Sequence, residues 1–223
     1  MRRVTAIAAA AVAAATVASG AAAATNECNG LRICVPVVGP WVLASPAGEV
    51  QFQLACPQRF VVAGLDAELS VRGIDVSFRG ALGTPVNPGI TTSTSAVFLA
   101  RLLRSASGAS FRPHIGCVPA SGGGDRYPTA FHPLPPTAPL TSELPVLPGT
   151  HRFLVGCPPA RRLVSATHAI GFFTTAPPKP VLARRVTVSQ ALTGGRVALT
   201  VHAGSLPGVR AIVQVDLVCA AAA

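Results

Sequence analysis

Six cysteines are the residues of this chain whose type and spacing most clearly indicate chemistry, and that chemistry is disulfide formation. Two intervals between them are nearly equal, at 61 and 62 residues, and each begins with a Cys-Pro pair that a phenylalanine precedes by four residues. Six cysteines allow fifteen pairings. Because the two long intervals match, the spacing predicts the pairs Cys56–Cys117 and Cys157–Cys219, which leaves Cys28–Cys34 to close a small loop.

Zinc coordination is the competing use of these thiols. The chain has no CxxC pair, and no histidine stands at a matched ligand spacing. We therefore expect disulfides, with no metal site and no cofactor. A disulfide that closes a loop of about sixty residues should stabilise its half of the chain by roughly 4 kcal/mol in the chain-entropy model.

Acid–base chemistry has weaker candidates. Of the five histidines, His114 and His202 fall on the outward side of alternating segments, and His132 and His151 lie in or beside a proline-rich stretch, so we expect all four to be solvated. His168 is the exception. Together with Asp66 and Asp75, it is the only motivation for an enzymatic reading.

Paired carboxylates also give little support for catalysis. Asp66 and Glu68 are the nearest pair on one face of a predicted strand, and the second half of the chain has no matching pair. A glycosidase needs two carboxyl groups at a defined separation, so we expect these two to be partners of arginine or surface charges. The sequence also has no GxSxG, HExxH or nucleotide-binding glycine loop. We therefore predict a protein that is not an enzyme.

Apolar and polar residues alternate around the cysteines with the two-residue period of a strand. The pattern covers VQFQLAC, FRPHIGC and VQVDLVC, and in each the cysteine falls on the apolar side. No amphipathic helix is evident after the N-terminus, so the fold class is all-β. Further strands are predicted at residues 67–71, 74–78, 96–103, 162–168, 181–188 and 196–202.

The repeated cysteine spacing predicts an internal duplication, with two tandem disulfide-stapled β-sandwich-like units joined by a Pro/Gly-rich linker. The first unit covers residues 49–118 and the second residues 150–223. The linker, residues 119–149, is an extended spacer in this reading, or it packs over both units and makes them one body. Residues 25–48 form an N-terminal segment that holds the small Cys28–Cys34 loop.

Residues 1–24 are typical of a secretory signal peptide, with Arg2 and Arg3, an apolar run and small residues before Thr25. A retained N-terminal anchor helix is the alternative. Cleavage near Ala24 predicts a secreted, extracellular protein without a membrane span in the mature chain, where disulfides persist.

The mature chain would keep sixteen basic and eight acidic residues, with Lys179 the only lysine. This excess favours anionic partners such as cell-wall or other extracellular polymers, for which the arginine pairs are the candidate residues: Arg161, Arg162, Arg184 and Arg185. One Trp and one Tyr provide little base stacking, which disfavours nucleic acid. Only 12% of the residues are charged, which is compatible with self-association.

The function expected from these features is a secreted, non-catalytic β module with a structural or binding role, whose partner is unknown. Two alternatives remain open. One is a secreted enzyme of unidentified type. The other is an inhibitor with a rigid exposed loop, formed by Pro85, Val86, Asn87, Pro88, Gly89 and Ile90.

Overall fold

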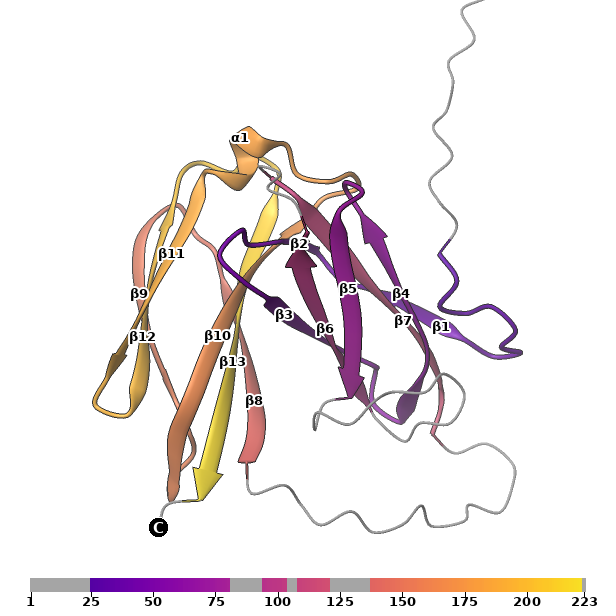
Figure 1. Ribbon diagram of the computed structural model, residues 1–223, viewed down its shortest axis with the longest axis horizontal. Coiled ribbons are helices and arrows are strands. Elements are labelled where there is room, and N and C mark those ends of the chain that lie inside the picture. The colour runs from indigo at the N-terminus through magenta and orange to yellow at the C-terminus, as the bar shows by residue number, and fades with distance from the viewer. Residues whose placement is uncertain (1–24, 81–93, 104–107, 121–136, 222–223) are drawn as a thin grey trace, which may run out of the picture.

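The computed structural model describes residues 25–80, 94–103, 108–120 and 137–221. The predicted signal peptide, the candidate loop at residues 85–90 and most of the predicted linker lie outside the described residues. The fold is all-β, with three antiparallel sheets, one of which curls into a half-barrel (Figure 1). No helix among the residues listed above is long and apolar enough to cross a membrane.

The strands divide into an N-terminal half (residues 25–120) and a C-terminal half (residues 137–221). The first contains β1 (Val35–Val38), β2 (Trp41–Leu43), β3 (Val50–Ala55), β4 (Phe60–Leu69), β5 (Ile74–Gly80), β6 (Ser95–Leu102) and β7 (Ser110–Pro119). The second contains β8 (Thr137–Pro145), β9 (Gly149–Gly156), β10 (Arg161–Phe173), the short helix α1 (Pro180–Ala183), β11 (Val186–Thr193), β12 (Arg196–Ala203) and β13 (Arg210–Ala221).

The largest sheet runs through both halves. Its strand order is β1-β7-β2-β10-β13-β8, and β4 also pairs with β7. The two smaller sheets belong to one half each, with the orders β3-β6-β5 and β9-β12-β11. In each half the small sheet packs against the part of the large sheet from the same half, as Figure 1 shows.

Two hydrophobic cores fill the spaces between these layers. The N-terminal core is centred on Phe52, Phe98 and Phe111, which are at most 1% exposed. The C-terminal core is mainly aliphatic, with Leu199, Leu217 and the aromatic Phe172 fully buried. Burial of each large side chain contributes about 1.5–3 kcal/mol, so the alternating pattern of the sequence selects the face of each strand that packs inward.

Three disulfides are present, and they join the pairs expected from the spacing. Cys56–Cys117 and Cys157–Cys219 each connect the end of a small sheet's first strand to the large sheet. Cys28–Cys34 closes a short loop before β1. Disulfides persist in oxidising compartments, so this set indicates an oxidising, extracellular environment.

The prediction for two segments differs from the structure. Residues 137–145 were assigned to the linker because they are rich in proline, but they form β8 and pair with β13. Proline is tolerated there because β8 is an edge strand. The strand predicted at residues 181–188 instead begins as α1, which has a proline at its start, and β11 follows from Val186.

Candidate functional site

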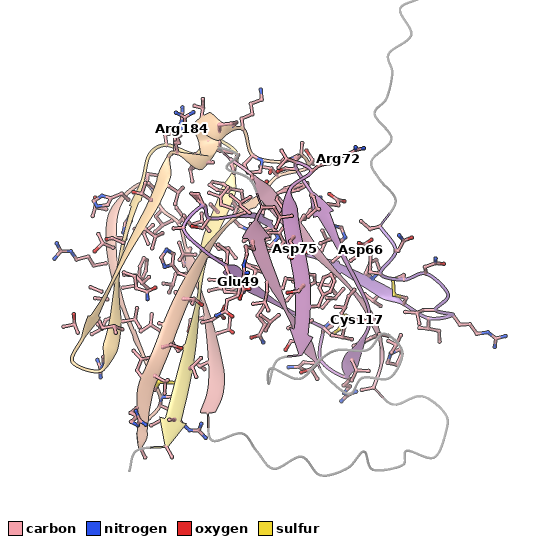
Figure 2. The ribbon with its side chains drawn as sticks, in the orientation of Figure 1. Glu49, Asp66, Arg72, Asp75, Cys117 and Arg184 are labelled. Atoms are coloured by element: carbon pink, nitrogen blue, oxygen red, sulfur yellow. A yellow bond between two sulfur atoms is a disulfide. The ribbon has the colours of Figure 1, made fainter. Side chains whose placement is uncertain are left out.

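The arginine pair Arg184–Arg185 lies directly after α1, at the end of the molecule opposite the last residues of β13 (Figures 1 and 2). α1 ends there, and both main-chain N–H groups still donate to carbonyls of the helical turn, Arg184 to Pro180 and Arg185 to Leu182. The pair lines a pocket of about 380 Å³, together with Gly149, Thr150, Thr187, His202, Ala203 and Gly204.

Three exposed polar residues that line this pocket lie side by side across the small sheet. Thr150 on β9 and Thr187 on β11 are both register partners of His202 on the central strand β12. The Thr150 hydroxyl lies 2.7 Å from Nδ1 of His202. Arg185 Nη1 donates to the Ser205 carbonyl at 2.6 Å, which fixes the guanidinium at the pocket rim. The pocket is therefore lined by two exposed arginines together with two threonines and a histidine.

No carboxylate is among the residues that line this pocket. The C-terminal half has two acidic residues, Glu143 and Asp216, both on the β8–β13 side of the large sheet. Against these two stand eight basic residues: Arg152, Arg161, Arg162, Lys179, Arg184, Arg185, Arg196 and Arg210. This half therefore carries a clear excess of basic residues, which favours anionic partners.

The second arginine pair is elsewhere. Arg161 and Arg162 begin β10 and are exposed beside Ala221 and Ala220 of β13. They lie at the end of β10 that is remote from α1 (Figure 1). The two pairs named from the sequence therefore do not form one site.

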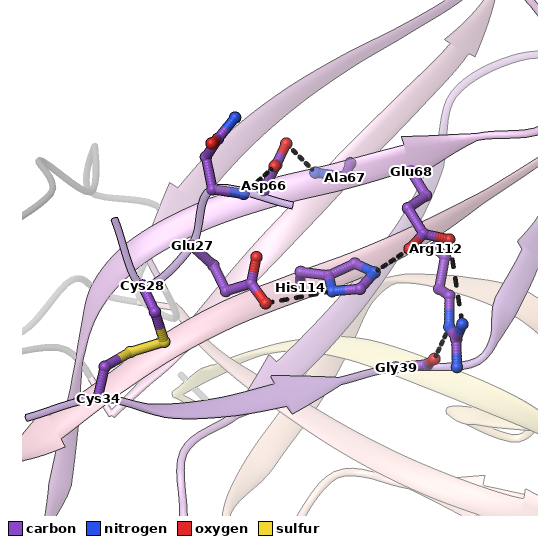
Figure 3. A network of polar contacts seen from close by, with 10 residues as sticks. Glu27, Cys28, Cys34, Gly39, Asp66, Ala67, Glu68, Arg112 and His114 are labelled. Atoms are coloured by element: carbon purple, nitrogen blue, oxygen red, sulfur yellow. Dashed lines mark hydrogen bonds and ion pairs between the residues drawn. A yellow bond between two sulfur atoms is a disulfide. The ribbon is translucent and has the colours of Figure 1, made fainter. Parts of the chain in front are cut away.

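His114 contradicts the expectation of a solvated side chain, since it is only 3% exposed. Its Nδ1 lies 3.5 Å from Glu27 Oε1, and its Nε2 lies 3.4 Å from Glu68 Oε1 (Figure 3). The alternation along β7 does place His114 on the outward side of the strand. The residues around Glu27 cross over that side and cover it.

Two glycines allow this crossing. Gly64 on β4 and Gly116 on β7 are register partners, and a Cβ atom on either would overlap the Glu27 carbonyl. Only the absence of side chains lets the N-terminal segment approach the sheet this closely. Glu27 is thereby buried to 6% exposure.

The carboxylates of Asp66 and Glu68 bind the protein itself. Asp66 accepts hydrogen bonds from the Asn26 main chain at 2.6 Å and from its own neighbour Ala67 at 2.7 Å. Glu68 contacts His114 and lies 4.0 Å from Arg112, whose guanidinium also faces the Trp41 ring at 5.9 Å. Both carboxylates line a pocket of about 540 Å³ beside Trp41.

His168 does not meet the carboxylates named with it in the sequence. It lines a different pocket, of about 460 Å³, and its Nδ1 lies 2.9 Å from Gln190 Oε1. Asp75 is an exposed residue of β5 beside Arg101, and Figure 2 places it with Asp66 on strands of the N-terminal half. The three residues therefore do not form a common site.

Asp216 is a buried group that the sequence analysis did not single out. It is 7% exposed, and burial raises its pKa to about 6, while a hydrogen bond from Thr141 opposes the shift. It stands three residues before Cys219, as His114 stands three residues before Cys117. This shared position before the closing cysteine is the sequence feature that could have indicated Asp216.

The chain matches no known protein family, no curated protein and no solved structure. Across the described ranges, no three histidine, cysteine or acidic side chains gather in an arrangement that could hold a metal ion.

Proposed function

We propose that this protein is a secreted, non-catalytic β module that binds an anionic extracellular polymer through the pocket at Arg184 and Arg185. The observation that carries the proposal is a pocket lined by two arginines, two threonines and a histidine, with no carboxylate among its lining residues. Guanidinium groups bind carboxylate, sulfate and phosphate oxygens through parallel hydrogen bonds.

The geometry supports recognition of a charged group rather than diffuse attraction alone. Arg185 is anchored to the Ser205 carbonyl, and Thr150 and Thr187 stand on the two strands that flank β12 in the small sheet. A preorganised pocket loses less conformational entropy on binding than a free side chain does. The surrounding positive charge of the C-terminal half adds attraction over a distance of about 8 Å at physiological salt.

The test is binding of heparin, a sulfated polysaccharide, and of polyglutamate, measured by titration calorimetry at increasing salt. Replacing both Arg184 and Arg185 with alanine should weaken binding at least about tenfold, since each charge-assisted hydrogen bond contributes about 1.5–3 kcal/mol. The matched control replaces Arg161 and Arg162 with alanine. It removes the same charge from the far end of β10 and should change affinity by less than about threefold.

Two outcomes would contradict the proposal. Equal losses in the two double variants would mean that scattered charge, and not the pocket, binds the polymer. Failure of the unmodified protein to bind either polymer at low salt would contradict the proposed binding function, because electrostatic attraction is strongest at low salt.

We further propose that the two halves are sandwich-like units that arose by duplication. The strand orders β3-β6-β5 and β9-β12-β11 correspond, as do the pairs β4–β7 and β10–β13. Both pairs have a register shift at the same distance after the first disulfide cysteine, at Val62/Gly64 and at Leu163/Ser165.

The tight turns between these strands also correspond. Arg59 and Ala160 both have positive φ, at 67° and 63°, each three residues after a disulfide cysteine. The residue that follows each donates to the carbonyl of the Cys-Pro proline at 3.1 Å. Positive φ is uncommon for residues other than glycine, so its recurrence at matched positions supports a common origin.

A further inference from the structure

A partly buried polar cluster lies where the N-terminal half packs against the C-terminal half. Gln53 extends from β3, and its side-chain Oε1 lies 2.7 Å from the Thr141 hydroxyl on β8. The same hydroxyl lies 2.7 Å from Asp216 Oδ1 on β13. Gln214, which is 1% exposed, bonds to both main-chain groups of Gln53. Gln53, Thr141, Gln214 and Asp216 together form the junction cluster.

The junction cluster is part of the contact between the halves. β3 lies against β10 and β13. Two residues before Gln53 on β3, Gln51 Nε2 donates to Thr167 Oγ1 of β10. Ala169 and Ile212 of the C-terminal half are members of the N-terminal hydrophobic core. A change in the cluster therefore acts on how β3 packs against the other half.

With the Gln53 amide in its observed orientation, hydrogen atoms are too few for every contact in the cluster if Asp216 is ionised. The Thr141 hydroxyl has a single hydrogen, yet both of its close partners, Gln53 Oε1 and Asp216 Oδ1, are acceptors. If Asp216 is protonated, its O–H donates to Thr141 and Thr141 donates to Gln53. Protonation of Asp216 thus satisfies both contacts at once.

Ionisation of Asp216 requires a different arrangement. Thr141 must then donate to the carboxylate, which leaves Gln53 Oε1 without its donor. Rotation of the Gln53 amide by half a turn restores the balance, because Nε2 then donates to Thr141 and Oε1 accepts from Ser95, which now lies 3.0 Å from Nε2. The cluster therefore has two discrete hydrogen-bond patterns that differ by one proton.

We propose that one proton on the junction cluster controls how tightly β3 packs against β8 and β13, so that the halves are closed together when Asp216 is protonated and loosen when it ionises. A buried carboxylate needs a compensating partner. Asp216 Oδ2 has no hydrogen-bond partner among the residues that the structure describes, and no ion pair to Asp216 occurs there.

The charged groups around the cluster do not offset the cost of burying an ionised Asp216. Glu143 of β8 is exposed and lies 3.5 Å from Gln214 Nε2. Glu49 precedes β3 and pairs with Arg101, and His168 of β10 bonds to Gln190. The raised pKa of Asp216, caused first by burial and opposed by Thr141, agrees with a proton that is held until about pH 6.

Amide hydrogen exchange of the full chain tests the proposal, because the Gln53 main-chain N–H donates to the Gln214 side chain inside the cluster. Protection factors, corrected for the intrinsic pH dependence, are compared at about pH 4.5 and about pH 7.5. We expect protection of the Gln53 amide to fall by about tenfold to a hundredfold at the higher pH. In the Asp216→Asn variant, protection should stay at the acidic level.

Glu143→Gln is the matched control, since it removes the neighbouring carboxylate and should leave the pH effect intact. Equal protection of Gln53 at both pH values in the unmodified protein would overturn the proposal, and so would loss of the pH effect in Glu143→Gln. If Asp216→Asn fails to fold, NMR titration of the Asp216 carboxyl carbon decides. A midpoint near pH 6 supports the proposal, and a midpoint near 4 refutes it.

Discussion

Replacing His114 with leucine should destabilise the protein more than replacing both His114 and Glu27 with apolar residues. In the described structure, the His114 imidazole at 3.5 Å is the only basic group that contacts the Glu27 carboxylate, and Glu27 Oε2 has no hydrogen-bond partner there. Leucine is close to histidine in volume, so the substitution removes the polar partner and leaves little cavity. The result is a buried carboxylate with no partner at all.

The expected loss follows from that isolation. Removing one member of a buried pair costs about 3–5 kcal/mol in the free energy of unfolding. Glu27→Met alone should cost only about 1–2 kcal/mol, because His114 keeps its contact with Glu68 at 3.4 Å. The double variant places two apolar side chains together and should lie within about 1 kcal/mol of the unmodified protein.

Guanidinium chloride unfolding with the disulfides intact measures these differences. Trp41 is the single tryptophan and belongs to the same half, where the Arg112 guanidinium lies 5.9 Å from its ring. Its fluorescence therefore reports on the unfolding of that half. His202→Leu is the control at an exposed histidine and should change stability by less than about 0.5 kcal/mol. A double variant that loses the sum of the two single effects would refute the coupling, as would a neutral His114→Leu.

Two further predictions concern stability. Replacing Cys157 and Cys219 with alanine should lower the free energy of unfolding by about 4 kcal/mol in the chain-entropy model. The same change at Cys28 and Cys34, whose loop is about ten times shorter, should lower it by about 2 kcal/mol. Equal losses in denaturant unfolding would count against the chain-entropy model for this protein. Asp216→Asn should raise the free energy of unfolding by up to about 3 kcal/mol at pH 7.5 and leave it nearly unchanged at pH 4. The sign follows because the Asp216 carboxyl has a pKa of about 6 when folded and 3.8 when unfolded, so the unmodified protein loses stability as the pH rises from about 4 to about 6. A gain that is the same at both pH values would exclude ionisation as the cause.

Strand positions and disulfide pairs were accessible from the sequence because both depend on local patterns. Alternation places Phe52 and Phe111 on the inward sides of their strands, and both are buried. Equal cysteine spacing is a consequence of equal strand order, so it indicates Cys56–Cys117 without knowledge of the sheets. β8 was missed because its prolines resemble a linker, and only the edge position in a sheet makes them compatible with a strand.

The buried polar groups were not accessible in the same way. Alternation tells which side of a strand a residue occupies, and His114 and Asp216 do lie on the side away from the disulfide-bonded core. What covers that side depends on segments that are distant in sequence: Glu27 crosses over Gly116 in one half, and Gln53 reaches Thr141 in the other. No periodicity of β7 or β13 contains that information.

The two halves cover the matched positions of His114 and Asp216 in different ways. Each stands three residues before the closing cysteine, and their register partners on the neighbouring strand, Asp66 and Thr167, also correspond. In the N-terminal half this face is covered by the chain's own preceding segment. In the C-terminal half the cover is β3, which belongs to the other half. If the halves are copies, the outer face of the sheet needed a cover in each, and the second copy obtained its cover from the first. The proton-dependent cluster then lies at the one place where the second half depends on its neighbour to bury a carboxyl group.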